Sequence, residues 1–251
     1  VLSLANKGEN TVQTSEVVTT LSGIDINAFQ IYEKNGVSKN LDQLDKRIIE
    51  GNKEIPVSQT QIIYEANYKY DEPASKTQDL GVNYCYKYRT LATADACLKK
   101  DVTKPSTEAK CSVNEQKIVG NSGAPVAVTL LTQRPVLANT LTFSLEITNL
   151  GTGEVYSPEF ILKNLCIEDR ESKDQLDIKI AFPDNNPKIK CPKLNDGNEG
   201  TLKMVQNKAF VTCTAETSDL QDSAFTKSLS TSIDYVYKDD APAQITIKSA
   251  T

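Results

Sequence analysis

The six cysteines are the residues of this sequence whose type and spacing most clearly point to a chemistry. They are Cys85, Cys97, Cys111, Cys166, Cys191 and Cys213. None of them forms a Cys-x-x-Cys pair, which is the spacing typical of a zinc site. The chain is also acidic and rich in Thr, Ser and Asn. We therefore expect disulfides and an oxidising compartment, with six reduced and buried thiols as the alternative.

The spacing leaves the pairing open, because six cysteines allow many complete pairings. Three cysteines precede residue 119 and three follow it, so either one bridge crosses between the halves or each half keeps a free thiol. Our working pairing is Cys97–Cys111, Cys191–Cys213 and Cys85–Cys166. The last of these bridges would cross a domain boundary and fix the angle between the domains.

The sequence contains no histidine and no tryptophan. The lack of histidine excludes the Ser-His-Asp and Cys-His catalytic arrangements and the common imidazole zinc sites. A pair of carboxylates could serve a glycosidase, but Asp and Glu total 33, so some pair is always available and the pattern is uninformative. We name no catalytic residue, and we expect a protein that is not an enzyme and needs no cofactor or metal.

One short segment has oxygen ligands at alternate positions, as in a calcium loop. Residues 196–200 read Asp-Gly-Asn-Glu-Gly. The segment lacks a third alternating ligand and a distal bidentate Glu, which calcium loops supply. We therefore expect a hairpin turn here.

Three tyrosines follow one another at every second position. Tyr84, Tyr86 and Tyr88 would share one face of a strand. They could form an aromatic platform for a sugar or a partner protein. The alternative is cross-strand packing with the hydroxyl groups at the rim. The lack of tryptophan, which sugar platforms usually use, favours packing.

Charge and hydropathy exclude two further classes of function. The net charge is −5, from 28 basic and 33 acidic residues, and an acidic surface repels nucleic acid. No run of 18 apolar residues is long enough to span a membrane. The chain has no initiator Met and opens inside the apolar stretch V-L-S-L, so we expect a mature or trimmed chain. Membrane attachment would then need a segment that is not present here.

Alternation of apolar and polar residues predicts an all-β protein. The clearest strands are residues 59–64, 142–147, 209–213 and 243–247, with turn signals between them. One short helix is expected over residues 41–49, with Asn40 as its N-cap.

Two motifs occur twice and in the same order. Residues 6–12 and 149–155 share the pattern Asn-x-Gly-x-x-x-Val, and residues 84–87 and 235–238 share Tyr-x-Tyr-Lys. Asn6 precedes Tyr84 by 78 residues, and Asn149 precedes Tyr235 by 86. The repetition predicts two tandem immunoglobulin-like β-sandwich domains, residues 1–118 and 119–251, stapled by disulfides. The Cys…Trp…Cys core of antibody domains is absent, so only the architecture is implied.

Several segments also resemble a known family. They are N-Y-C-Y-K-Y-R-T-L-A-T-A-D-A-C-L-K at 83–99, K-C-S-V at 110–113, G-A-P-V-A-V-T at 123–129 and I-D-Y-V-Y at 233–237. The chain resembles a functionally uncharacterised family of secreted or membrane-anchored proteins from small-genome archaea. The resemblance implies two β-sandwich domains behind an N-terminal hydrophobic segment. It implies no catalytic residue.

These observations predict a non-enzymatic extracellular protein of the cell surface. It would act in surface architecture or adhesion, as a subunit of a filament or surface layer whose partners are further copies or other surface proteins. The apolar first strand could be donated to the open edge of a neighbour; its residues are Val1, Leu2, Ser3, Leu4 and Ala5. Pairing within its own domain is the alternative. The alternative function is a glycan- or protein-binding module.

Overall fold

The structure is a computed structural model that describes residues 1–31, 36–47, 49–50, 53–54, 58–104, 111–161 and 166–249. It is all-β, as the alternation predicts. The strands are β1 (Leu2–Ala5), β2 (Val17–Ser22), β3 (Val37–Lys39), β4 (Ile49–Glu50), β5 (Lys53–Glu54), β6 (Gln59–Ile62), β7 (Lys76–Leu98), β8 (Glu115–Lys117), β9 (Val119–Asn121), β10 (Val126–Leu137), β11 (Thr140–Asn149), β12 (Glu154–Tyr156), β13 (Gln175–Ala181), β14 (Ile189–Lys190), β15 (Glu199–Lys203), β16 (Lys208–Glu216) and β17 (Phe225–Ile247), with a 3₁₀ turn η2 (Pro192–Leu194).

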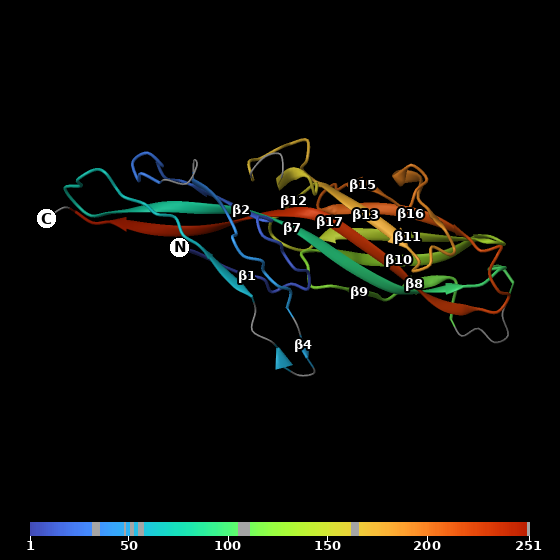
Figure 1. Ribbon diagram of the computed structural model, residues 1–251. Coiled ribbons are helices and arrows are strands. Elements are labelled where there is room, and N and C mark those ends of the chain that lie inside the picture. The colour runs from blue at the N-terminus through green and yellow to red at the C-terminus, as the bar shows by residue number, and fades with distance from the viewer. Residues whose placement is uncertain are drawn as a thin grey trace. The chain divides into compact units, whose positions relative to one another are not determined.

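Four sheets contain these strands. The largest has the order β15-β13-β17-β7-β2-β3, with β12 beside β17 and β9 beside β7. A five-stranded sheet has the order β14-β16-β11-β10-β8, and two small sheets pair β1 with β6 and β4 with β5. The longest strands, β7 and β17, have 23 residues each and are neighbours in the largest sheet (Figure 1).

Contacts between residues divide the chain into two compact units. Unit 1 consists of Val1–Tyr88, Thr152–Lys173 and Val236–Thr251, and unit 2 of Arg89–Gly151 and Asp174–Tyr235. Each unit therefore draws on distant parts of the sequence. Residues 119–121, at the expected domain boundary, form β9. The units follow contact density rather than chain order, so the division at residue 118 stays a prediction.

The core of unit 2 contains strands along which buried side chains alternate with more exposed ones. Along β11, every second side chain from Leu141 to Asn149 is buried, and Phe143 and Ile147 are fully enclosed. β11 pairs with β10 on one side and with β16 on the other, so one face of three neighbouring strands is apolar. This face is what the period of two in residues 142–147 predicts.

The predicted helix over residues 41–49 is wrong for its described part, because residues 41–47 contain no helix. Ile48 lies outside the described residues. Leu44 pairs its backbone with Val12 in both directions, at 2.8 and 3.0 Å. This distant pairing replaces the local hydrogen bonds that a helix would need.

Asn40 acts within this loop and not as a helix cap. Its side chain is fully buried and accepts a hydrogen bond from the Val17 N–H at 2.9 Å. It donates to the carbonyl oxygens of Gln13 and Asp42, at 3.0 and 2.7 Å. One amide therefore ties three backbone segments together.

We expect Asn40→Ala to lower the free energy of unfolding by about 1–3 kcal/mol, because it leaves buried backbone groups without partners. Leu41→Ala is the control, since Leu41 is 83% exposed and should change stability by less than about 0.5 kcal/mol. Urea unfolding measures both. Equal effects of the two substitutions would contradict this role of Asn40.

Candidate functional site

The six cysteines lie in three disulfides, and the pairing is the same as the working pairing from sequence. The bonds are Cys85–Cys166, Cys97–Cys111 and Cys191–Cys213. Cys85 and Cys166 both belong to unit 1, because the chain returns to that unit at Thr152, before Cys166. Their bond therefore lies inside one compact unit, and its expected role across a boundary at residue 118 stays a prediction, like that boundary.

The Cys85–Cys166 bond lies in the hydrophobic core of unit 1. Its neighbours in one buried cluster include Val18, Tyr156 and Val236. Val18 lies opposite Cys85 in the β2–β7 register, and the Tyr156 ring stacks on another buried ring, that of Phe160, at 4.1 Å between centroids. The bond therefore links β7 to the segment that follows β12 within a buried hydrophobic cluster.

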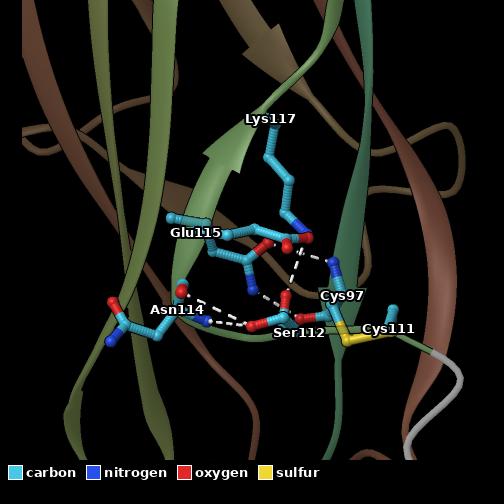
Figure 2. The surroundings of a disulfide bond; sticks show 7 residues. Cys97, Cys111, Ser112, Asn114, Glu115 and Lys117 are labelled. Atoms are coloured by element: carbon cyan, nitrogen blue, oxygen red, sulfur yellow. Dashed lines mark hydrogen bonds and ion pairs between the residues drawn. A yellow bond between two sulfur atoms is a disulfide. The ribbon is translucent and has the colours of Figure 1, made fainter.

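A buried lysine lies beside the Cys97–Cys111 bond (Figure 2). The side chain of Lys117 is only 6% exposed. Its amine donates to the Ser112 carbonyl at 2.9 Å and pairs with the Glu115 carboxylate at 2.5 Å. A buried ammonium needs such partners, so these contacts fix the segment between Cys111 and β8.

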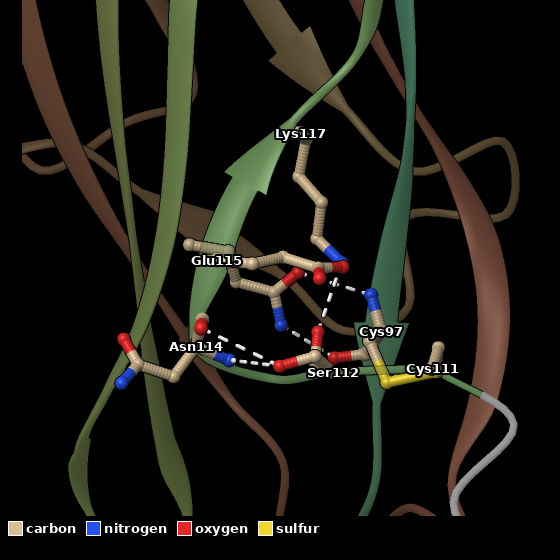
Figure 3. A network of polar contacts seen from close by, with 7 residues as sticks. Cys97, Cys111, Ser112, Asn114, Glu115 and Lys117 are labelled. Atoms are coloured by element: carbon tan, nitrogen blue, oxygen red, sulfur yellow. Dashed lines mark hydrogen bonds and ion pairs between the residues drawn. A yellow bond between two sulfur atoms is a disulfide. The ribbon is translucent and has the colours of Figure 1, made fainter.

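Further polar contacts hold the same segment (Figure 3). The Asn114 N–H donates to the Ser112 hydroxyl at 3.3 Å, which closes a tight turn. On the β7 side, the side-chain amide of Gln133 binds the backbone of Cys97 twice: it accepts from the N–H at 3.0 Å and donates to the carbonyl at 2.5 Å. The amide occupies the position that a neighbouring strand would take.

The side-chain amide of Asn121 likewise binds both backbone groups of one residue, on β10. Its side chain accepts from the Val128 N–H at 2.9 Å and donates to the Val128 carbonyl at 3.0 Å. Thr90 donates to the Val126 carbonyl at 2.7 Å. Sequence reasoning missed Asn121, Gln133 and Lys117, because their partners lie far away or depend on the tertiary fold.

The three tyrosines of the predicted partner surface contact one another. The Tyr86 ring lies 6.3 Å from that of Tyr84, 5.8 Å from that of Tyr88 and 5.7 Å from that of Tyr237. Tyr84 and Tyr86 are half-buried, and Tyr88 is buried. Burial raises the pKa of Tyr84, and the negative charge of Asp239 raises it further, so this hydroxyl stays protonated. The contact of Tyr86 with Tyr237 joins β7 to β17 and matches cross-strand packing, whereas the other two contacts run along β7. A partner role stays a prediction.

The repeated Asn-x-Gly motif adopts the same local geometry twice. The Asn6 side chain accepts from the Gly8 N–H, and the Asn149 side chain accepts from the Gly151 N–H, both at 3.1 Å. This is the Asx turn that asparagine favours. The motif therefore has a structural role at the exit of β1 and of β11.

A tyrosine hydroxyl accepts from the backbone four residues after each of these asparagines. The Asn10 N–H donates to Tyr88 at 3.3 Å, and the Gly153 N–H donates to Tyr237 at 2.7 Å. The structural equivalent of Tyr237 is thus Tyr88 and not Tyr86, which the sequence motif aligned with it. A Cβ on Gly153 would lie 2.7 Å from the Tyr237 ring, so this close approach needs glycine.

The segment Asp-Gly-Asn-Glu-Gly follows a tight antiparallel turn, in which the Cys191 N–H donates to the Gly197 carbonyl at 2.8 Å, but it does not join two strands of one sheet as a regular hairpin does. It links β14 to β15, which belong to different sheets. The Asp196 N–H donates to the Cys191 carbonyl at 3.1 Å, and Asn195 and Asp196 adopt positive φ angles. The turn crosses between sheets because Cys191 is held on β16 by its bond to Cys213.

Two open grooves of unit 2 flank Ile118, which is 93% exposed. One has a volume of about 560 Å³ and is lined in part by Thr93, Asp95 and Glu115. The other, of about 550 Å³, is more apolar and includes Val128 in its lining. Ile118 lines both, because the chain crosses there from β8 in one sheet to β9 in another.

Among the described residues, Cys, Asp and Glu do not gather into a group that could hold a metal ion. In the same part of the chain, no helix has the length and hydropathy of a membrane span. No family model matches the chain, and neither a curated protein nor a solved structure shows significant similarity to it.

Removal of different disulfides should have different effects. The Cys85–Cys166 bond closes 81 residues and the Cys97–Cys111 bond closes 14. If loop entropy dominates, Cys85→Ala/Cys166→Ala costs about 4.5 kcal/mol and Cys97→Ala/Cys111→Ala about 3 kcal/mol. Guanidinium unfolding of the two double variants tests the order. A larger loss for the shorter loop would contradict the expectation.

The hydroxyl groups of Tyr88 and Tyr237 should contribute similar amounts to the free energy of unfolding. We expect Tyr88→Phe and Tyr237→Phe each to lower the free energy of unfolding by about 1–2 kcal/mol, since each leaves a backbone N–H without its acceptor. Tyr70→Phe is the matched control, because Tyr70 is 53% exposed. Thermal and urea unfolding provide the comparison, and a control loss as large as the other two would refute it.

Proposed function

We propose that the chain is a non-enzymatic structural or adhesive subunit of an extracellular surface. The observation that carries the proposal is the set of three disulfides, which leaves no described cysteine free. Disulfides persist in oxidising compartments and are rare in reducing ones. They stabilise a fold under conditions in which a cell cannot refold or replace it readily.

The proposal includes the finer architecture of two tandem immunoglobulin-like sandwiches. The repeated Asx turns support it, as do the two tyrosine hydroxyls that accept from equivalent backbone positions. A duplicated domain would carry each contact once per copy. Such a chain resembles the secreted or anchored archaeal family named above and would take further copies or other surface proteins as partners.

A binding module for glycans or proteins is the second candidate. The groove beside Thr93, Asp95 and Glu115 favours it, because hydroxyl and carboxylate groups face a space of about 560 Å³. Polar groups of this kind bind sugar hydroxyls. The half-buried rings of Tyr84 and Tyr86 could supply apolar contacts elsewhere on the molecule.

Electron microscopy of native, non-reduced protein, with light scattering beside it, tests the structural role. Filaments or lattices are expected for a structural subunit. A monomer at every concentration would overturn the assembly role and favour the binding module. A glycan array then decides the second candidate, with Asp95→Asn as a variant that should lose any signal from the groove.

A further inference from the structure

The unpaired edge of a sheet is where a β protein can add a strand from another chain. Most edges in the described residues are capped or short. Asn121 and Thr90 cap β10, and the Lys193 amine caps the Phe210 carbonyl on β16 at 2.9 Å. The edge strands β3, β8 and β14 have only two or three residues each. The edge strand β15 has five residues but carries the charged side chains of Glu199 and Lys203, which protect an edge.

The two-stranded sheet of β1 and β6 differs from these, because the outer edge of each strand lacks a neighbouring strand among the described residues. β1 pairs with β6 from Leu2 opposite Ile62 to Ala5 opposite Gln59, and the next N–H, that of Asn6, donates to Ser58 at 3.1 Å. Hydrogen-bonded positions alternate along an antiparallel ladder. Leu2 and Leu4 therefore direct their backbone groups to β6, and Ser3 and Ala5 direct theirs to the other side.

Within the described ranges, no strand occupies that other side of β1. Ser3 and Ala5 are exposed. Residues 1–5 contain no charged side chain, proline or glycine, which are the features that usually protect an edge. A sheet of only two strands is also marginally stable by itself, so it gains from a third.

We propose that β1 pairs with β1 of a second copy of this chain, antiparallel and about a two-fold axis at Leu4. In this register, Ser3 of one copy lies opposite Ala5 of the other, and the two residues exchange N–H···O=C hydrogen bonds on each side of the axis. The two Leu4 side chains are then direct cross-strand neighbours. β1 stays paired with β6, so this is an added strand and not a donated one.

The second copy is favoured over other occupants by symmetry and charge. Antiparallel pairing of a strand with itself satisfies both edges through one two-fold operation, which closes the assembly. In this register Leu2 of one copy lies opposite Asn6 of the other, and residues 2–6 carry no charged side chain, so these paired residues meet no like-charge repulsion. Pairing of β1 with β6 of the next copy would instead give an open chain of molecules, and the test below distinguishes the two.

The inference rests on the proposed function, because it names the partner of an assembling subunit. Four backbone hydrogen bonds contribute only about 0.5–1.5 kcal/mol each. The interface is also far smaller than the roughly 1,000 Å² of a stable dimer. Pairing is therefore weak in dilute solution and becomes effective where copies are concentrated, as on a surface.

Disulfide trapping in the full chain tests the register. Leu4→Cys places two thiols at a non-hydrogen-bonded pair, with Cα atoms about 4.5 Å apart, which suits a disulfide. Leu2→Cys is the matched control, because Leu2 lies on the same face with similar burial but about 13 Å from its counterpart. Under mild oxidation at high protein concentration, the Leu4→Cys dimer should form about tenfold faster on non-reducing gels, as expected from this difference in reach.

A second variant tests the backbone contacts. Ser3→Pro removes an outward N–H without touching the β6 ladder, and should lower the Leu4→Cys rate to that of Leu2→Cys. Ser3→Thr keeps the N–H and should leave the rate unchanged. Circular dichroism confirms that each variant is folded. Equal rates of dimer formation for Leu4→Cys and Leu2→Cys would overturn the pairing of β1 with β1. This result is also the one expected if β1 pairs with β6 of the next copy.

The two proposals can fail separately. Ordered particles in electron microscopy without faster Leu4→Cys trapping would leave the surface role standing and refute the β1 contact. Fast trapping without ordered particles would support the β1 contact and refute the assembly role.

Discussion

The bond between Cys85 and Cys166 is the constraint on which unit 1 depends most. It joins the middle of a 23-residue strand to a segment 81 residues later in the chain. Around it lie Val18 from β2, Tyr156 from β12 and Val236 from β17, all fully buried. These strands are distant in sequence, and the covalent bond lowers the loop-closure entropy that is lost when they form a common core.

Side-chain hydrogen bonds take the place of strand pairing or turns at several points in each of the two units. Asn40 holds a loop in place of a helix, Asn121 and Gln133 bind the backbones of β10 and β7, and the hydroxyl groups of Tyr88 and Tyr237 accept from backbone N–H groups of turns. Each such group satisfies buried or edge backbone that would otherwise cost free energy. Edges that are satisfied within the chain do not recruit others, which makes the free edge of β1 informative.

Sequence reasoning could predict features that depend on local pattern. Period-two alternation predicted the strands at residues 142–147 and 209–213 because one buried face imposes that period. The repeated Asn-x-Gly motif coincides with two equivalent turns, after β1 and after β11. The helix at residues 41–49 failed, since the pairing of Leu44 with Val12 is a tertiary contact that no local pattern contains. The sites of Lys117 and Gln133 were unpredictable for the same reason.

Peptide mapping of native, non-reduced protein tests the central claim most directly. The account predicts three linked pairs, with the peptide of Cys85 joined to that of Cys166 and no free thiol. Detection of Cys85 or Cys166 as a free thiol, or of either cysteine joined to another partner, would contradict the account. The core of unit 1 would then need a different explanation.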